Sequence, residues 1–301
     1  MCYIYTVVYK NIKIIVNPVS GKDEAILSFI AEAFKDSEIH WDVLVTKKEG
    51  DAKEFAEGLI HSGADLICVY GGDGTVCQVA QALAHQDIPM FVLPGGTANV
   101  VAKELKMPID SKAALDLIKT GSLTEKRMDI GMCGDDYFLL RINIGFVADM
   151  VSKADPNLKA AIGQLAYGVT AISHILQSEP QKYSLIIDGV TKDVEGVAIV
   201  IGNVGNIGLQ DVSMVPDSDS TDGMLDVIVL HKGDLPSVMK AAGSALMQQK
   251  AEDVYSHWQA KEVSIVVPSS QTVMCDDLEM TTKNISAKII PQALRILVPT
   301  A

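Results

Sequence analysis

The 301-residue sequence has little positive charge, few cysteines and no long uninterrupted apolar run. It contains 25 lysines and arginines against 38 aspartates and glutamates, which gives a formal net charge of −13. This balance argues against a nucleic-acid-binding protein, because such proteins present a basic surface to the phosphates. It also disfavours adhesion to an anionic bilayer unless a local basic or apolar patch makes the contact.

The cysteines are odd in number and show no CxxC spacing. Three lie within apolar runs, where a buried free thiol is the common case, so we expect a reducing, cytoplasmic environment. We expect no signal peptide, and the longest apolar segment, 158–176, carries Lys159 and His174 and suits a buried helix better than a membrane span. The five cysteines are Cys2, Cys68, Cys77, Cys133 and Cys275.

The first 128 residues alternate short apolar runs with amphipathic segments. The short runs are typical of buried strands, and the stretches between them have apolar residues at helical spacing. This alternation predicts a mostly parallel sheet with helices on both faces. The predicted strands are 12–16, 41–45, 66–70 and 90–93, and the predicted helices are 23–34, 50–60 and 75–84.

The pattern changes after about residue 128 to one dominated by strands, several of which end in Asp-Gly, Gly-Asn or Lys-Gly turn residues. Only 157–177 and 234–248 have helical spacing there. We therefore predict an α/β domain over 10–128 and a β-rich domain over 129–291, packed closely around a cleft because no flexible linker separates them. The predicted strands of the second domain are 137–144, 183–188, 194–202, 225–230, 263–267 and 286–290.

Glycine-rich turns follow two of the predicted strands, at VYGGDGT (69–75) and LPGGTAN (93–99). Backbone N–H groups and the positive end of the following helix make such turns suited to phosphates. A small polar turn, NPVSGK (17–22), also ends the first predicted strand. Because ligands of open parallel sheets bind at the carboxyl ends of the strands, we expect the three turns to converge. Neither a GxGxxG fingerprint nor a Walker loop is present in them.

Asp73 lies at the tip of the first glycine turn. A carboxylate there would repel bound phosphates unless it holds Mg²⁺ or accepts a proton. The alternative is an Asp-Gly turn whose side chain caps the helix that follows. From this motif alone, both interpretations stay open.

Taken in order, the motifs resemble the diacylglycerol kinase catalytic family of lipid kinases, which includes bacterial YegS-like lipid kinases and, more distantly, sphingosine kinases. The resemblance implies a three-layer α/β N-terminal domain, similar to NAD kinases and phosphofructokinases, and a β-sandwich C-terminal domain. It also implies that a last strand, about 292–301, returns to the first domain. The motifs are NPVSG (17–21), TKKEGDA (46–52), GGDGT (71–75), GGTAN (95–99), GQLAYGVTAI (163–172), VPDSDSTDGMLDV (215–227), DLE (277–279) and PQALRILVP (291–299).

The resemblance implies an ATP- and Mg²⁺-dependent kinase that transfers the γ-phosphate to a hydroxyl of diacylglycerol or a related lipid. It implies that Asp73 and Asp129 belong to the network that holds the catalytic Mg²⁺ and that Glu279 is the general base, the acids meeting in the cleft. A lipid substrate implies a transient contact with a membrane surface, and a homodimer stays open. The implied nucleotide-binding residues are Asn17, Ser20, Gly21, Thr46, Gly71, Gly72, Asp73, Gly74, Thr75, Val76, Gly96, Thr97 and Asn99.

A second, structural metal site is implied by the same resemblance. Its ligands would be Asp219 and Asp222 through their carboxylates and Met224 through its carbonyl oxygen. Oxygen ligands of this kind are those that hard divalent cations prefer. The alternative is an acidic loop without a metal.

Two positions depart from the family pattern. Val100 stands where many members have an acid, and Leu278 stands where the acidic turn usually has a glycine. The second departure leaves the base open between Glu279, Asp277 and Asp276. GGDGT alone also fits an NAD-kinase-like phosphotransferase or a phosphofructokinase-like sugar kinase. The two departures favour a further alternative, a non-catalytic nucleotide- or lipid-binding relative.

Overall fold

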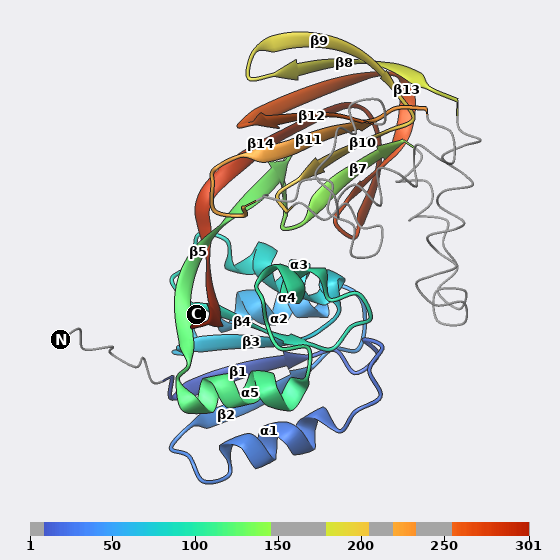
Figure 1. Ribbon diagram of the computed structural model, residues 1–301. Helices are drawn as coiled ribbons and strands as arrows, with labels where there is room; N and C mark the ends of the chain where they lie inside the picture. The colour runs from blue at the N-terminus through green and yellow to red at the C-terminus, as the bar shows by residue number, and fades with distance from the viewer. Residues whose placement is uncertain (1–8, 146–178, 205–218, 233–254, 301) are drawn as a thin grey trace, which may run out of the picture. The chain divides into compact units, whose positions relative to one another are not determined.

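The structure is a computed structural model, and it describes residues 9–145, 179–204, 219–232 and 255–300 (Figure 1). The chain divides into two compact units, of which the first is Met1–Met128 with Gln292–Ala301 and the second is Asp129–Pro291. Two strands, β5 (Leu123–Cys133) and β14 (Leu278–Pro299), have residues in both units. The helices predicted at 157–177 and 234–248 lie outside the described residues. Within those residues, no helix is long and apolar enough to cross a bilayer.

The N-terminal unit is built on a sheet in the strand order β14-β4-β3-β1-β2, in which the last part of β14 lies parallel to β4. β1 to β4 are parallel, because each intervening helix carries the chain back across a face of the sheet. β3 and β4 are buried along their whole length, as expected of a parallel sheet covered on both faces. The bounds are β1 Asn11–Val16, β2 His40–Val45, β3 Leu66–Gly71 and β4 Met90–Pro94.

Helices cover both faces of this sheet, with α2, α3 and α4 on one face and α1 and α5 on the other (Figure 1). Each of the longer helices has apolar residues at a helical period and buries them against the sheet, as α1 does with Ile26, Ile30 and Phe34. The predicted three-layer α/β architecture is therefore confirmed. The bounds are α1 Ile26–Phe34, α2 Asp51–Leu59, α3 Asp73–Leu83, α4 Val100–Glu104 and α5 Ser111–Thr120.

The second unit is a β-sandwich of antiparallel strands, as predicted. One series of strands runs in the order β12-β11-β10-β7-β13, and the β8–β9 hairpin pairs with the first part of β13. The register between β13 and β14 shifts between Val266 and Gln271. Such an irregularity bends a strand, so β13 pairs with β8 before the bend and with β7 after it. The bounds are β6 Asp136–Phe138, β7 Arg141–Gly145, β8 Gln181–Ile187, β9 Val190–Gly196, β10 Ala198–Gly202, β11 Leu225–Leu230, β12 Tyr255–Ala260 and β13 Glu262–Cys275.

The core of the second unit is formed by the inward side chains of these strands, among which Tyr183 and Phe138 are the bulkiest. The Phe138 ring lies directly over Gly131 of β5. A Cβ atom at Gly131 would lie 2.0 Å from Cζ of Phe138, so only glycine fits opposite this ring. The close packing fixes β5 against the hairpin strand β6, with which it pairs.

Two strands predicted as single are divided in the structure. The predicted strand 137–144 is interrupted between β6 and β7, because the N–H groups of Leu139 and Leu140 bond the carboxylate of Asp276 instead of a neighbouring strand. The predicted strand 194–202 is interrupted at Val197, between β9 and β10. The strands β5 and β12 were not predicted.

Candidate functional site

The turns that follow β1, β3 and β4 are in direct contact. Nδ2 of Asn17, in the first turn, donates to Oγ1 of Thr75 in the second at 2.9 Å. The first turn also meets the third, since a Cβ atom at Gly21 would lie 3.0 Å from Oγ1 of Thr97. Gly21 has a φ of 105°, a left-handed conformation that favours glycine. The predicted convergence of the three turns is therefore confirmed.

Gly72 and Gly96 bring the backbones of the second and third turns together. A Cβ atom at Gly96 would lie 2.5 Å from Cα of Gly72, closer than side chains allow. A Cβ atom at Gly95 would lie 2.8 Å from Cζ of Tyr70 and 3.0 Å from Oγ of Ser20. These glycines are required because any side chain would separate the turns.

Asn99 closes the third turn on itself. Its Oδ1 accepts the Gly96 N–H at 2.8 Å, and its Nδ2 donates to the Gly96 carbonyl at 2.7 Å. The backbone of Asn99 is left-handed, with a φ of 49°, a conformation that asparagine tolerates. Gly96 and Asn99 thus shape the turn, and the hydroxyl-bearing Thr97 between them is exposed.

The first turn of α3 has backbone donors without an acceptor in the helix. This helix begins at Asp73, two residues before its predicted start, with Gly72 as its N-cap. The Val76 N–H donates to the Gly72 carbonyl at 3.1 Å, so the N–H groups of Asp73, Gly74 and Thr75 have no acceptor within the helix. Together with the helix dipole, these groups suit a phosphate.

The half-buried Asp73 carboxylate links this helix to the next one. Its Oδ1 accepts the N–H of Val101, in the first turn of α4, at 3.0 Å. Asp73 is the first residue of α3, after the N-cap Gly72, and its carboxylate bonds α4, so the interpretation of Asp73 as the cap of α3 is wrong. Oδ2 of Asp73 has no hydrogen bond within the described part of the chain. Val100 begins α4 and is 7% exposed, so no acid assists Asp73 at this position.

Thr46 lies at the end of β2, beside the first turn. Its N–H donates to the Val16 carbonyl at 2.9 Å, and its hydroxyl lies 3.5 Å from the same oxygen. The next turn is held by Asp51, whose carboxylate accepts the N–H groups of Lys47 at 2.7 Å and Lys48 at 3.1 Å. These hydrogen bonds, the one from Lys47 most, lower the pKa of Asp51.

A contact that the sequence did not signal supports the turns. The Tyr70 hydroxyl donates to Oε1 of Glu24 at 2.9 Å, and the Ser111 hydroxyl donates to the same oxygen at 2.5 Å. Burial, reinforced by the Glu24 carboxylate, raises the pKa of Tyr70. Because the Tyr70 ring is the one that meets Gly95, this network holds the third turn in place. Its members lie far apart in sequence and form no motif.

Hydrogen bonds within the second unit hold both the main chain and the side chain of Asp129. Its N–H donates to the Ser220 carbonyl at 2.8 Å, and its Oδ2 accepts the Gly223 N–H at 2.6 Å. Nδ2 of Asn203 donates to its carbonyl at 2.9 Å. Only 1% of Asp129 is exposed. This acid therefore lies against the loop that precedes β11.

The predicted metal ligands Asp219 and Asp222 lie in that loop, where each carboxylate already bonds nearby groups. Oδ1 of Asp219 accepts the N–H and the hydroxyl of Thr221, and Oδ1 of Asp222 accepts the Met224 N–H at 2.8 Å. Burial and the neighbouring carboxylates raise the pKa of Asp222. Among the described residues, no three acidic, histidine or cysteine side chains are grouped as a metal site would require. The structural metal site stays a prediction.

Glu279 is exposed near the start of β14, opposite Met274 of β13. The hairpin turn before it, Asp276-Asp277, begins with a left-handed residue, since Asp276 has a φ of 51°. The Asp276 carboxylate accepts three N–H groups of segment 139–141, at 2.6, 3.0 and 2.9 Å. Both carboxylate oxygens of Asp276 thus accept backbone N–H groups, whereas Glu279 and Asp277 are exposed.

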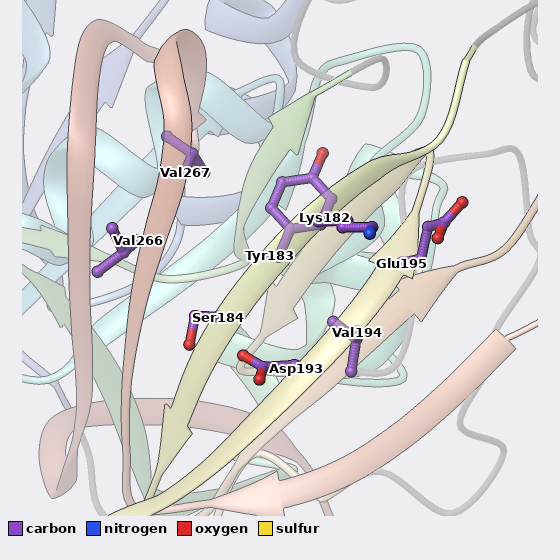
Figure 2. A pocket seen from close by; sticks show the side chains of 8 residues that line it. All are labelled: Lys182, Tyr183, Ser184, Asp193, Val194, Glu195, Val266 and Val267. Carbon is purple, nitrogen blue, oxygen red and sulfur yellow. The ribbon is translucent and has the colours of Figure 1, made fainter.

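The second unit also has a surface hollow of about 570 Å³, formed by β8, β9 and β13 (Figure 2). This volume lies within the usual range of small-molecule sites. The predicted site residues are not among those that line it, so the hollow adds nothing to the assignment of the site. Its lining residues are Lys182, Tyr183, Ser184, Asp193, Val194, Glu195, Val266 and Val267.

Two family models together match most of the chain. Residues 11–133 match the diacylglycerol kinase catalytic domain, and residues 141–298 match the YegS C-terminal NAD kinase beta sandwich-like domain. The second match alone covers more than half of the chain. The two matched ranges contain the three turns, Asp73, Asp129 and Glu279.

Similar sequences carry related names. The chain is 28% identical to a diacylglycerol kinase of Bacillus subtilis over 249 residues, covering 81% of each chain. It is 29% identical to a probable lipid kinase YegS-like of Pseudomonas putida over 269 residues, covering 88% of each.

Solved structures from Bacillus anthracis share the fold. One diacylglycerol kinase structure aligns with a TM-score of 0.75 and 24% identity, over 96% of this chain and 97% of the other. Another aligns with a TM-score of 0.81 and 25% identity, over 99% and 98%.

Proposed function

We propose a lipid kinase activity for this chain, which belongs to the diacylglycerol kinase catalytic family and has a second domain of the YegS C-terminal type. In this proposal, the protein uses Mg²⁺ and ATP to phosphorylate a hydroxyl of diacylglycerol or a related lipid. Relatives that match it over most of its length are named diacylglycerol kinase or lipid kinase. The observation that supports the nucleotide part of this proposal is the contact of three turns beside the start of α3, with Asp73 among them.

The N-terminal unit would hold the nucleotide through backbone donors. The N–H groups of Asp73, Gly74 and Thr75 lack helical acceptors and would bind phosphate oxygens. Asn17 bonds the hydroxyl of Thr75, and Thr97 is an exposed residue of the third turn. The remaining implied contacts, Ser20, Gly21, Thr46, Gly71, Gly72, Val76, Gly96 and Asn99, line or shape the same turns.

The acids fit a magnesium-dependent reaction. Asp73 offers Oδ2, a hard carboxylate ligand of the kind that Mg²⁺ prefers. When bound, Mg²⁺ offsets the negative charge of the phosphates. The family resemblance assigns Asp129 to the same network. Because Asp129 is only 1% exposed, we assign it a supporting role through bound water rather than an open coordination position.

Glu279 is our assignment for the general base. A carboxylate within hydrogen-bond reach of the lipid hydroxyl would accept its proton as the oxygen attacks phosphorus. Glu279 is exposed, whereas Asp276 has both carboxylate oxygens engaged by backbone N–H groups. Asp277 is exposed as well, so matched variants of Glu279 and Asp277 separate these two.

An insoluble substrate requires contact with a lipid surface. We propose that this contact is transient, because a net charge of −13 opposes adhesion to anionic lipids. Flotation with neutral and anionic vesicles measures it, and size-exclusion chromatography with light scattering decides whether the protein is a homodimer.

A substrate panel tests the proposed function. Labelled ATP is supplied in a single turnover with diacylglycerol, phosphatidylglycerol, sphingosine or NAD, in mixed micelles with and without Mg²⁺. We expect label in a lipid, and only with Mg²⁺ present. Label in NAD with none in any lipid would instead support the NAD-kinase-like alternative, and label in nothing would support a non-catalytic relative.

A further inference from the structure

Asn203 and Asp276 both bind the short segment 139–141 between β6 and β7, through complementary groups. Asn203 contacts its carbonyls, since the Asn203 N–H donates to Leu140 at 2.9 Å and Nδ2 donates to Leu139 at 3.0 Å. Asp276 contacts its N–H groups, accepting all three at 2.6 to 3.0 Å. The Asp276 N–H also donates to the Arg141 carbonyl at 2.9 Å. The segment is thereby held through both its donors and its acceptors.

Each of these two residues is also tied to one of the acids assigned above. Nδ2 of Asn203 makes a second bond, to the carbonyl of Asp129 at 2.9 Å. Asp276 opens the two-residue turn that leads into β14, three positions before Glu279. Hydrogen bonds therefore connect Asp129 to Asn203, Asn203 to segment 139–141, and this segment to Asp276. The main chain then leads from Asp276 to Glu279, and the whole path lies within the second unit.

The Asp129 end of the path is rigid because Asp129 and Asn203 are buried. Asn203 is 2% exposed and Asp129 is 1% exposed. A buried amide that loses a partner carries the full cost of desolvation, so its hydrogen bonds fix a single geometry. The two carbonyl oxygens that face Nδ2 also establish which end of the Asn203 amide is the nitrogen.

We propose that Asn203 and Asp276 are positioning residues of the kinase reaction, which hold Asp129 and the turn carrying Glu279 in one frame. The inference rests on the roles proposed for those two acids. Neither positioning residue touches the reacting atoms. Asn203 bonds the main chain of Asp129, Asp276 begins the turn that leads to Glu279, and both bond segment 139–141.

The second unit contains a matched control for Asp276. Asp188 also begins a hairpin turn with a left-handed φ, 46°, and its carboxylate accepts the N–H groups of Lys261 at 3.0 Å and Glu262 at 2.9 Å. Its own N–H donates to the Glu262 carbonyl at 3.0 Å. The two aspartates thus make the same structural contact, but Asp188 holds the turn between β12 and β13 instead of segment 139–141.

The kinetic test compares Asp276→Asn with Asp188→Asn. Asparagine tolerates the left-handed backbone, but its Nδ2 would face an N–H group where a carboxylate oxygen now accepts. We expect Asp276→Asn to lower kcat about 10- to 100-fold, with KM for ATP changed less than about threefold, because a small displacement of the acids affects the chemical step. Asp188→Asn should keep kcat within about twofold. Equal losses in both variants, or an Asp276→Asn kcat within about threefold of wild type, would overturn the proposal.

Hydrogen exchange gives a readout that needs no activity. In Asn203→Ala we expect the Gly223 amide, which donates to Asp129, and the amides of 139–141 to exchange at least about tenfold faster. The amides of Lys261 and Glu262 should be unchanged. Unchanged exchange at Gly223 overturns the positioning role of Asn203. If Asn203→Ala does not fold, exchange in Asp276→Asn decides. A wild-type protein that labels no lipid refutes the proposed function, while the exchange result still decides whether the frame exists.

Discussion

The two carboxylate oxygens of Asp73 have different roles, one structural and one proposed for catalysis. Oδ1 holds the N–H of Val101, and Oδ2 is the oxygen that we assign to Mg²⁺. Asp73→Asn keeps an oxygen for Val101 but removes the charge. We expect kcat to fall about 100-fold or more, because a lost charge contact in the transition state costs about 3–4 kcal/mol.

The measurement is initial rate against Mg²⁺ concentration, together with the thermal midpoint. The midpoint should stay close to that of wild type, since the bond to α4 survives. A kcat within about threefold of wild type would remove Asp73 from the mechanism. Because Val100 is apolar and buried, no neighbouring acid at that position can substitute for Asp73.

Gly96 gives a second prediction at this scale. Gly96→Ala would place a Cβ atom 2.5 Å from the Cα of Gly72, so the second and third turns must separate. We expect nucleotide affinity to fall at least about tenfold, because the phosphate donors lose their arrangement. The measurement is calorimetric titration with an ATP analogue. The control is Gly58→Ala in α2, where a Cβ atom meets nothing within 4 Å.

Gly58→Ala should bind nucleotide like wild type and raise stability by about 0.5–1 kcal/mol, as alanine does in a helix interior. If both variants bind nucleotide equally well, the close approach of Gly72 and Gly96 is not needed for binding.

At the scale of elements, the connection between β2 and α2 depends on one ionised side chain. Hydrogen bonds from the N–H groups of Lys47 and Lys48 lower the pKa of Asp51. A lowered pKa means that the carboxylate stabilises the fold above its ordinary pKa of about 3.9, and that this stability is lost as the pH falls through the lower, folded-state value.

We therefore expect Asp51→Asn to lower the thermal midpoint at pH 7 and to approach wild type as the pH falls from about 4 toward 2. Thermal melts of both proteins at several pH values measure this. A difference that stays constant down to the lowest pH would show that the charge of Asp51 does not matter. Asp42→Asn is a useful comparison, because it changes an exposed acid of β2 that pairs with Lys13 instead of bonding backbone N–H groups.

Elements defined by local pattern were predicted well, and those defined by distant partners were not. The strands and helices of the first 94 residues match the predicted ones to within a few residues, because each has its own apolar period. The run 137–144 has no glycine or proline, so nothing local predicts its interruption. The interruption comes from Asp276, 137 residues after Leu139. β12 was missed because its sequence, YSHWQA, has few apolar residues.

In the candidate site, too, the local motifs were predicted and the contacts between distant residues were not. The three turns were found because each is a local motif, and a parallel sheet brings such motifs to one edge. The supports of the site were not found, because Glu24, Tyr70 and Asn203 act through residues far along the chain. An Asp-Gly turn before a helix also predicts capping of α3 by Asp73, but the carboxylate bonds α4 in the structure.

At the scale of the whole molecule, the N-terminal unit depends on the last residues of the chain. Ile296 pairs with Met90 of β4 and is 0% exposed, and Arg295 forms an ion pair with Glu125. Ile296→Ala should therefore destabilise the N-terminal unit by about 2–5 kcal/mol, the usual range for a buried isoleucine. Val190→Ala, at a position 58% exposed, should change stability by less than about 0.5 kcal/mol.

The two tryptophans allow the units to be followed separately. Trp41 lies in β2 of the N-terminal unit and Trp258 lies in β12 of the second. Urea unfolding in Trp258→Phe and Trp41→Phe backgrounds thus reports each unit in turn. We expect Ile296→Ala to shift the Trp41 signal. A shift confined to the Trp258 signal would contradict the assignment of the last strand to the first unit.

The return of β14 to β4 also determines the order in which the protein can be completed during translation. Strands β1 to β4 leave the ribosome early, but the strand that covers the open edge of β4 is synthesised only after the whole second unit. Until then, the growing chain presents an unpaired, apolar edge strand, the kind of surface that chaperones bind and that drives aggregation. The N-terminal unit is therefore synthesised first, but its sheet is completed only when the last residues of the chain have been made.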